Sequence, residues 1–411
     1  MADRRVVITG MGAVSPVGNT AQSMWESMKA GKNGIDYITR FDTADYPVKV
    51  AGEVKDFDAA AILGKKEARR MDRFCQFGVA AGVEAMEDAA FGDQMPDPYR
   101  FGLIIGSGIG GIETMYNESI KLHEKGYRKM NPLFVPIMIS NMAAGNLSIR
   151  YGLKGHCTCV VTACATGTHA IGDAFRIIKY GQADAMLAGG AEATITPLAV
   201  GGFVGISALS IASDPNRASI PFDKERTGFV MGEGAGVVVL EEYEHAKKRG
   251  AKIYAEVLGY GATADAYHMT APDPEAEGCV HAMRLCLEEG GVQPDQVDYI
   301  NAHGTSTLYN DKTEALAIKK VFGESTKVAV SSTKSMTGHL LGAAGAIEVI
   351  ACANAIVDGY LPPTINYQVK DEECDLDVVP NQGRAQEVAY AVSNSLGFGG
   401  HNASLLLGKL K

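Results

Sequence analysis

The amino-acid sequence predicts an α/β fold of stacked sheets and helices, built from two related halves. Short β-rich runs alternate with glycine-rich turns and helical apolar spacing, as in RVVITG, FGLIIGSG, AMLAGG and GVVVLEE. Such alternation is typical of layered α/β folds. In addition, residues 157–181 and 328–359 look like two versions of one unit, a strand, a small polar turn and a helix. We therefore predict an N-terminal half at 1–256 and a C-terminal half at 257–411.

The composition narrows the class of protein. The chain has 411 residues, 46% of them hydrophobic and 21% charged, and its net charge of −10 disfavours a nucleic-acid partner. Eight scattered cysteines without a C-x-x-C pair indicate a reducing compartment, and the nine histidines show no metal-binding spacing. The sequence shows neither the apolar core of a signal peptide nor an apolar run long enough to suggest a membrane span. We therefore expect a cytoplasmic protein without a membrane partner.

A basic stretch, GKKEARRMDRF (64–74), stands out in this acidic chain. At helical spacing, Lys66, Arg69, Arg70 and Arg73 would share one face. Such a run is usually a solvated face, but it also suits docking of an acidic partner through electrostatic steering.

The motif GSGIGG (106–111) fits the glycine pattern of a dinucleotide-binding loop, between a β-rich run and a helical pattern. The acidic strand end expected about 20 residues further on is missing, and KLHEKGYRKMNP stands there instead. A nicotinamide-dependent oxidoreductase is therefore an alternative from a different functional class.

Cys164 lies at the join of the first repeated unit, in CVVTACATGTHA. The run from Cys157 to Thr162 predicts a strand, and apolar residues spaced from Ile171 to Ile178 predict a helix that ends near Gly181. A helix N-terminus lowers the pKa of a cysteine and favours the nucleophilic thiolate. A free cysteine is equally a small core side chain. The segment alone leaves both interpretations open.

The stretch NAHGTSTLYND (301–311) follows a predicted strand end and places His303 in a loop of small polar residues. A histidine there can exchange a hydrogen bond with a substrate carbonyl, and the hydroxyls of Thr305 and Thr307 can bind a polar ligand arm. A turn whose hydroxyls bond their own backbone is the alternative.

The second repeated unit contains SSTKSMTGHLLGAAG (331–345). We place His339 at a helix start, where the dipole would keep the ring neutral and suited to donate to an oxyanion. Lys334 lies on the preceding turn, and a capping loop with a surface lysine is the alternative. The helix that follows is apolar nearly all round and is expected in the core. The pattern S-x-x-K at 331–334 lacks its serine acyl-enzyme companion motifs.

Near the C-terminus, NSLGFGGHNASLLL places Phe398 between glycines ahead of a predicted strand. This residue would be either a flexible aromatic gate or part of a plain glycine-rich turn.

Taken together and in this order, these motifs resemble the β-ketoacyl-acyl-carrier-protein synthases, condensing enzymes of the thiolase superfamily. The resemblance extends from VVITGMGAVSPVG to NSLGFGGHNASLLL, and GSGIGG, DKERTGFVMGEGAG and DAYHMT are most similar to the type II enzymes of bacterial fatty-acid synthesis. It implies a five-layered αβαβα fold and a decarboxylating Claisen condensation. An acyl chain would be joined to malonyl-acyl carrier protein to give a 3-oxoacyl product and CO2, without a cofactor of the enzyme's own.

The resemblance also implies roles for the catalytic residues. Cys164 would carry the acyl chain as a thioester, with the backbone N–H groups of Cys164 and Phe398 forming the oxyanion hole. His303 and His339 would donate hydrogen bonds to the malonyl thioester oxygen, and Lys334 would orient them.

Further roles follow from the same resemblance. Glu348, on the helix that follows Lys334, would contact the catalytic residues and not the substrate. Phe398 would gate the pocket. Thr305 and Thr307 would hold the phosphopantetheine arm, while Ile109 would lie along the acyl pocket.

The resemblance implies partners as well. Lys66, Arg69 and Arg70 would meet the acidic acyl carrier protein, and the protein would be a homodimer in which Ile109 approaches the partner subunit. No metal is required. Some relatives hold a structural monovalent cation, here at Asn301, Ala302, Glu348, Ser393 and Asn394.

The chain departs from the family pattern in places. Val161 replaces a frequent Asp or Asn, Leu308 and Tyr309 replace a proline and a small residue, and Ser207 replaces an arginine of some relatives. A polyketide ketosynthase with the same residues is the nearest alternative. A chain-length factor is disfavoured by the presence of Cys164.

Overall fold

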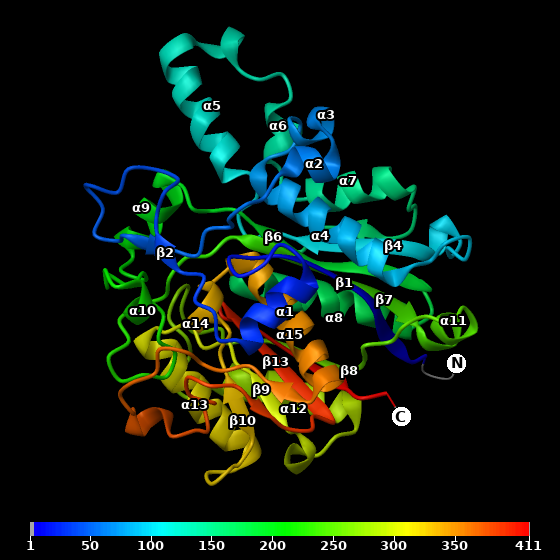
Figure 1. The fold of residues 1–411 in the computed structure, drawn as a ribbon, viewed down its shortest axis with the longest axis vertical. Helices are drawn as coiled ribbons and strands as arrows, with labels where there is room; N and C mark the ends of the chain where they lie inside the picture. The colour runs from blue at the N-terminus through cyan, green and yellow to red at the C-terminus, as the bar shows by residue number, and fades with distance from the viewer. Residues whose placement is uncertain (1–3, 411) are drawn as a thin grey trace.

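The computed structural model describes residues 4–410 and centres on a ten-stranded mixed sheet (Figure 1). Its strand order is β10-β9-β13-β14-β8-β1-β7-β6-β4-β5. Two small sheets pair β2 with β3 and β11 with β12. The strands are β1 (Val6–Val14), β2 (Asp36–Tyr37), β3 (Val50–Ala51), β4 (Phe101–Gly106), β5 (Cys157–Thr158), β6 (Ala185–Glu192), β7 (Gly234–Glu242), β8 (Ala255–Ala264), β9 (Tyr299–Asn301), β10 (Ala329–Ser331), β11 (Tyr360–Leu361), β12 (Arg384–Ala385), β13 (Tyr390–Gly397) and β14 (His401–Gly408).

The strand directions repeat in the two parts of the sheet. In the N-terminal part, β5, β4 and β6 run parallel, and β7 and β1 follow antiparallel. In the C-terminal part, β10, β9 and β13 run parallel, and β14 and β8 follow antiparallel. The two parts meet where Val6–Ile8 of β1 pairs with 255–257 of β8.

Helices separate and cover the two parts of the sheet in five layers, αβαβα. α4 and α7 pack on the outer face of the N-terminal strands, α8 and α15 fill the middle, and α12 and α13 cover the outer side of the C-terminal strands. The helices are α1 (Ala21–Lys29), α2 (Ala59–Leu63), α3 (Lys65–Ala68), α4 (Arg73–Ala89), α5 (Ile112–Lys125), α6 (Phe134–Met138), α7 (Met142–Tyr151), α8 (Thr166–Lys179), α9 (Pro197–Gly205), α10 (Pro215–Ala218), α11 (Tyr243–Lys248), α12 (Glu277–Gly290), α13 (Leu308–Phe322), α14 (Lys334–Thr337) and α15 (Ala344–Asp358).

Alternating side chains of single strands explain this layering. On β7, Val237 and Val239 join the cluster under α4, whereas Val238 and Leu240 join the central cluster. Since successive side chains of a strand point to opposite faces, a strand buried on both sides reads as a continuous apolar run. The same division explains the other apolar strands.

The apolar helix expected in the core is α15. The stretch Leu341–Asp358 is long and apolar enough to cross a membrane, but most of it is buried inside the structure. By this placement it is the central helix of the layered core, as expected.

The strand predicted from Cys157 to Thr162 is wrong beyond Thr158. β5 pairs only with Leu103 and Ile104 of β4, and the chain then crosses Gly106 instead of pairing. A Cβ on Gly106 would lie 2.6 Å from the carbonyl oxygen of Val160. Because residue 106 is a glycine, the backbone at Val160 can pass close over it. The strand ends there, and the chain continues to Cys164.

The continuous helical face predicted for the basic stretch is also wrong. α3 ends at Ala68, and α4 begins only at Arg73 with Asp72 as its N-cap. The Asp72 carboxylate accepts the N–H of Thr114 at 2.9 Å, which anchors this break to α5. Lys66, Arg69 and Arg70 are exposed on α3 and the turn after it, whereas Arg73 is bound to Glu233 (2.7 Å).

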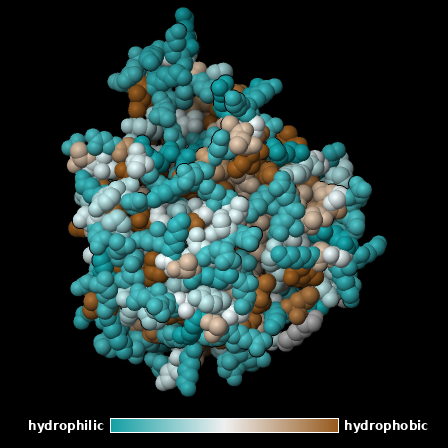
Figure 2. All heavy atoms as spheres, viewed as in Figure 1, coloured by the Kyte–Doolittle hydropathy of each residue, from teal (hydrophilic) through white to brown (hydrophobic). Residues whose placement is uncertain are grey.

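An arm built from α5 and α6 projects from the rest of the molecule (Figure 1). Large apolar side chains are exposed on it, and brown patches lie among polar atoms there in Figure 2. The exposed apolar side chains of the arm include Met115, Ile120, Leu122, Leu133 and Val135.

Candidate active site

A cavity of about 290 Å³ brings together the four segments singled out in the sequence. Cys164, His303, His339 and Phe398 all line it, although they come from distant parts of the chain. The two repeated units converge here from opposite parts of the sheet.

Cys164 lies in a 3-10 turn, Ala163–Ala165, immediately before α8. The N–H of Phe398 donates a hydrogen bond to its sulfur, so the GFGG turn lies directly against the thiol. Burial raises the pKa of the Cys164 thiol to about 12, although Lys334 opposes this shift. The acidification expected from the helix end is therefore wrong, because desolvation outweighs the favourable charges.

The two histidines face each other across the cavity. Their ring centroids are 5.2 Å apart and the rings are nearly perpendicular, at 84°. Burial, and then the charge of Lys334, lowers the pKa of both His303 and His339 well below its usual value. Both rings are therefore neutral at pH 7. We expected a helix start to keep His339 neutral, but α15 begins only at Ala344, so burial and Lys334 are the cause.

The hydrogen bonds of His339 indicate its tautomer. The N–H of Leu341 donates to Nδ1 at 3.3 Å, so a neutral ring carries its proton on Nε2. That Nε2 is buried without a partner among residues 4–410, as is Nδ1 of His303. An Nε2–H donor without a protein acceptor suits a substrate carbonyl oxygen.

Glu314 of α13 positions His303, and the sequence analysis missed it. Its carboxylate accepts the N–H groups of His303 and Gly304, both at 2.8 Å. Burial raises the pKa of Glu314 to about 7. An acidic residue on a helix gives no sequence signal of this contact, which arises only when α13 packs under the loop.

Lys334 is not a surface residue. It is 1% exposed and forms a buried ion pair with Glu348 of α15, which is also 1% exposed. Burial raises the pKa of Glu348, and Lys334 opposes that shift. Lys334 does not line the cavity, so it acts on the histidines and the thiol through its charge.

Three of the residues at which a monovalent cation was anticipated carry a buried oxygen atom without a hydrogen-bond partner in the described chain. These atoms are Oδ1 of Asn301, Oε2 of Glu348 and Oγ of Ser393. Asn394 donates to Glu314 (3.4 Å) and accepts from Ser404 (2.8 Å). Buried oxygens without partners are the donor type that hard cations prefer, so this set fits such an ion.

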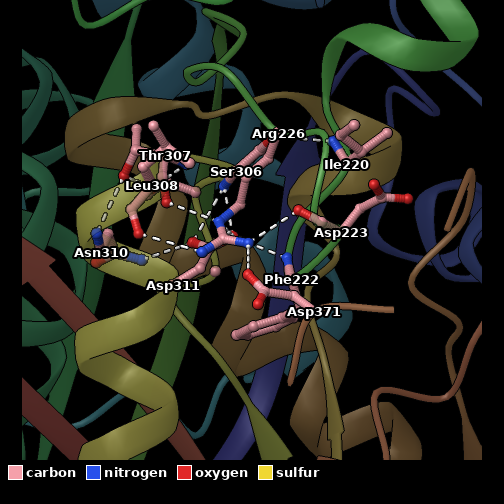
Figure 3. A network of polar contacts seen from close by, with 12 residues as sticks. Ile220, Phe222, Asp223, Arg226, Ser306, Thr307, Leu308, Asn310, Asp311 and Asp371 are labelled. Atoms are coloured by element: carbon pink, nitrogen blue, oxygen red, sulfur yellow. Dashed lines mark hydrogen bonds and ion pairs between the residues drawn. The ribbon is translucent and has the colours of Figure 1, made fainter. Parts of the chain in front are cut away.

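The loop carrying Thr305 and Thr307 is fixed by Arg226, a second contact that the sequence analysis missed (Figure 3). The two threonine hydroxyls are 2.9 Å apart at the cavity. The buried Arg226 guanidinium donates to the carbonyl oxygens of Thr307 and Leu308, both at 3.2 Å, and to Asp371 at 2.5 Å. The planar guanidinium thus fixes the backbone of the loop beside the cavity.

Other predicted residues lie at or beyond the cavity. Phe398 lines it, with its ring centroid 6.4 Å from that of Phe203. Ile109 is 39% exposed and is not among the lining residues. Lys66, Arg69 and Arg70 lie on α3 and the turn after it, away from the cavity lining. Three of the departures from the family pattern line the cavity: Ser207, Leu308 and Tyr309.

The glycine motif at 106–111 does not offer a phosphate cradle. The N–H groups of Gly108 (2.8 Å) and Ile109 (3.2 Å) donate to the carboxylate of Glu192. A dinucleotide phosphate would need these same donors and would meet a buried carboxyl group instead. This arrangement disfavours the oxidoreductase alternative.

Comparisons with known proteins agree with this geometry. A curated protein of Staphylococcus aureus, named 3-oxoacyl-[acyl-carrier-protein] synthase 2, is 53% identical over 410 residues, covering 100% of this chain and 99% of its own. A protein of the same name from Synechocystis is 52% identical over 408 residues, covering 99% and 98%.

Solved structures share the fold. A beta-ketoacyl synthase from Burkholderia phymatum superposes with a TM-score of 0.92 at 36% identity and covers 99% of this chain and 100% of its own. A type II PKS acyl-carrier protein in complex with its ketosynthase bound to the hexaketide gives a TM-score of 0.92 at 35% identity, with coverages of 99% and 100%.

Two family models match the chain in succession. "Beta-ketoacyl synthase, N-terminal domain" matches residues 3–246, and "Beta-ketoacyl synthase, C-terminal domain" matches residues 254–368. The chain belongs to the beta-ketoacyl synthase family and has its thiolase-like fold.

Proposed function

We propose that the protein is a 3-oxoacyl-acyl-carrier-protein synthase II, a condensing enzyme of fatty-acid elongation. One observation carries the proposal: a thiol that touches a backbone N–H faces two neutral histidines in one cavity. The curated relatives at 52–53% identity bear this enzyme name.

The first half-reaction moves an acyl chain onto Cys164. The sulfur attacks the carbonyl carbon of an acyl thioester on acyl carrier protein, and the N–H groups of Cys164 and Phe398 hold the developing oxyanion. The bond from that carbon to the carrier sulfur breaks. The carrier thiol leaves with the proton given up by Cys164, so atoms and charge balance.

The second half-reaction forms the new carbon–carbon bond. The malonyl thioester loses CO2, and its electron pair passes into an enolate whose oxygen accepts hydrogen bonds from His303 and His339. The enolate carbon attacks the acyl-Cys164 carbonyl and expels the cysteine sulfur as a thiolate, which takes up one proton from water to give the free thiol. The products are 3-oxoacyl carrier protein, CO2 and the free thiol.

Neutral histidines suit this second step. An imidazolium would tend to transfer its proton to the enolate. A neutral imidazole instead donates a hydrogen bond through its N–H and retains the proton. The lowered pKa values of His303 and His339 thus support their proposed role. Burial does most to keep the two rings neutral, the positive charge of Lys334 adds to this effect, and Glu348 balances that charge.

Remaining residues serve binding. Thr305 and Thr307 would hold the phosphopantetheine arm at the cavity mouth, and Phe398 would gate the acyl side. Ile109 would complete the acyl pocket. Its exposure in the single chain fits an approach by a partner subunit.

We infer that acyl carrier protein docks on Lys66, Arg69 and Arg70. All three are exposed in an otherwise acidic chain, and a shallow groove lies alongside at Lys65 and Arg69. A related ketosynthase of solved structure is in complex with its acyl-carrier protein, which supports a partner of this class.

We further infer a cytoplasmic homodimer without a resident cofactor. The exposed apolar side chains on the α5–α6 arm support a subunit contact. All eight cysteines are free, which suits a reducing compartment. A monovalent cation at Asn301, Glu348 and Ser393, with Ala302 and Asn394 beside it, would be structural and would enter no chemical step.

Fatty-acid elongation is favoured over polyketide synthesis by degree of similarity. The relatives named 3-oxoacyl-[acyl-carrier-protein] synthase 2 are 52–53% identical, whereas the type II PKS ketosynthase is 35% identical. The presence of Cys164 argues against a chain-length factor.

Turnover tests the proposal. Malonyl carrier protein should be condensed with saturated acyl carrier proteins of graded chain length, releasing one CO2 per 3-oxoacyl product. C164A should form no product. Tight binding of NADH in an ultraviolet titration, without condensation, would favour the oxidoreductase alternative.

A further inference from the structure

Glu192, at the end of β6, is a buried carboxyl group that the proposed chemistry leaves unused. It is 0% exposed. One oxygen, Oε1, accepts from Ser107 Oγ (2.9 Å) and the N–H of Ile109 (3.2 Å). The other, Oε2, accepts from the N–H groups of Gly108 (2.8 Å) and Gly342 (3.0 Å). Four donors from two segments far apart in the chain therefore converge on one side chain.

One of these segments lies beside Cys164, and the other follows His339. The loop 106–111 carries Ile109, and Gly342 follows His339 by three positions. A Cβ on Gly342 would lie 2.5 Å from the backbone nitrogen of Gly108, and a Cβ on Gly108 would lie 3.6 Å from the carbonyl oxygen of Ala163. Hence the loop, the His339 segment and the turn before Cys164 meet at Glu192.

The Glu192 carboxylate lies so close to Gly108 and Gly342 that neither position has room for a side chain. A Cβ on Gly108 or Gly342 would come within 2.6 Å or 2.8 Å of Oε2, so both glycines are needed for the approach. Ser107 extends the network, because its Oγ also accepts the N–H of Gly110 at 3.0 Å. Burial raises the pKa of Glu192 to about 7, and the hydrogen bonds from Ser107 and the three amides oppose that shift.

We propose that Glu192 is a positioning residue that fixes the Ile109 loop against the turn of Cys164 and thereby sets which acyl chains the thiol accepts. This inference rests on the proposed function, in which Ile109 completes the acyl pocket. Glu192 touches no reacting atom in it, and it acts through the backbone of the loop.

Replacing the carboxylate by an amide isolates this role. In E192Q a single oxygen remains for four donors, so whichever way the amide is turned, the N–H of Ile109 or of Gly108 faces an NH2 group. The loop loses an anchor with almost no change in side-chain volume. S107A is a milder variant, which removes one donor and the acceptor for Gly110.

The experiment measures acylation of Cys164 in the full-length protein by acyl carrier proteins of graded chain length, with the melting temperature in parallel. We expect E192Q to reduce the ratio between the best and the worst chain by about ten-fold, the effect of one lost hydrogen bond to a charged acceptor. S107A should shift the ratio in the same direction by less. Because a ratio of rates cancels the folded fraction, a merely structural role would leave it unchanged.

E84Q is the matched control. Glu84 also accepts two backbone N–H groups, from Ala13 and Ala21 (both 2.8 Å), burial also raises its pKa to about 7, and it does not line the cavity. Its chain-length ratio should equal that of the wild type. If E192Q and S107A both keep the wild-type ratio, the inference is overturned. If the wild type itself is not acylated at Cys164, the proposed function fails instead.

Discussion

At the scale of single residues, burial decides the electrostatics of the site. The sequence identified Cys164, His303, His339 and Lys334 by type and order, and the structure brings the first three to one cavity with Lys334 behind them. The protonation states could not be assigned from sequence. They depend on desolvation, which raises the pKa of the thiol and lowers those of the imidazoles.

The free thiol should therefore react slowly near neutrality. With a pKa of about 12, the thiolate fraction of Cys164 rises about ten-fold for each pH unit across the range from 7 to 9. We expect the rate of its alkylation by iodoacetamide, followed by peptide mass spectrometry, to rise in proportion. C164S provides the blank. A plateau below pH 8 would show that the thiolate is stabilised after all.

The buried pair of Lys334 and Glu348 gives a second residue-scale prediction. K334M should lower the free energy of unfolding by about 3–5 kcal/mol, because it leaves the Glu348 carboxyl buried without a partner. The double variant K334M/E348Q should recover much of that loss. Chemical denaturation of the three proteins measures both effects, and equal stability of K334M and the wild type would contradict them.

The same pair should control the pH profile of decarboxylation. Burial is the larger cause of the lowered pKa of both histidines and Lys334 the next, so removing the lysine raises each pKa part of the way toward the ordinary value of about 6.5. Decarboxylation of malonyl carrier protein should then begin to fall at a higher pH in K334M/E348Q than in the wild type, which stays flat down to pH 6. Matching profiles would mean that the lysine charge does not act on the histidines.

At the scale of elements, the sequence predicted strands and buried helices well and predicted breaks poorly. β1, β4, β6, β7 and α15 follow from apolar runs that the core requires. The shortness of β5 and the break between α3 and α4 depend on tertiary contacts, the crossing over Gly106 and the Asp72–Thr114 hydrogen bond. Neither contact leaves a local pattern in the sequence.

Close approach of α15 to the sheet gives an element-scale prediction. A Cβ on Gly236 of β7 would lie 2.7 Å from the backbone nitrogen of Ile347, so G236A should push α15 and Glu348 away from the sheet. We expect a loss of about 1–3 kcal/mol in unfolding free energy, measured by denaturation. G202A is the control, since a Cβ there meets nothing within 4 Å. Equal stability of the two variants would show that α15 accommodates the methyl group.

At the scale of the whole molecule, the site exists only because two parts of similar strand order meet. Cys164 comes from the N-terminal part and the two histidines from the C-terminal part, and the order of the motifs allowed the sequence to pair them. Contacts of Glu192, Arg226 and Glu314 could not be anticipated, because each spans at least ten positions of the chain to bind backbone groups.

Docking of acyl carrier protein on the exposed basic residues can be tested by charge reversal. R69E/R70E should raise the KM for acyl carrier protein about ten-fold and weaken its salt dependence, with little change in kcat, because two attractive surface charges are reversed. K248E, a charge reversal on the exposed side of α11, is the control. An equal change in KM for both proteins would place the docking surface elsewhere.

In the proposed reaction, Cys164 carries the acyl chain that an enolate then attacks. The most direct measurement is peptide mass spectrometry of the protein after incubation with acyl carrier protein thioester, before and after addition of malonyl carrier protein. We predict an acyl mass on the peptide of Cys164 alone, which disappears as CO2 and 3-oxoacyl carrier protein form. An acyl mass on another cysteine, on none, or one that persists after malonyl carrier protein is added would contradict this reaction sequence.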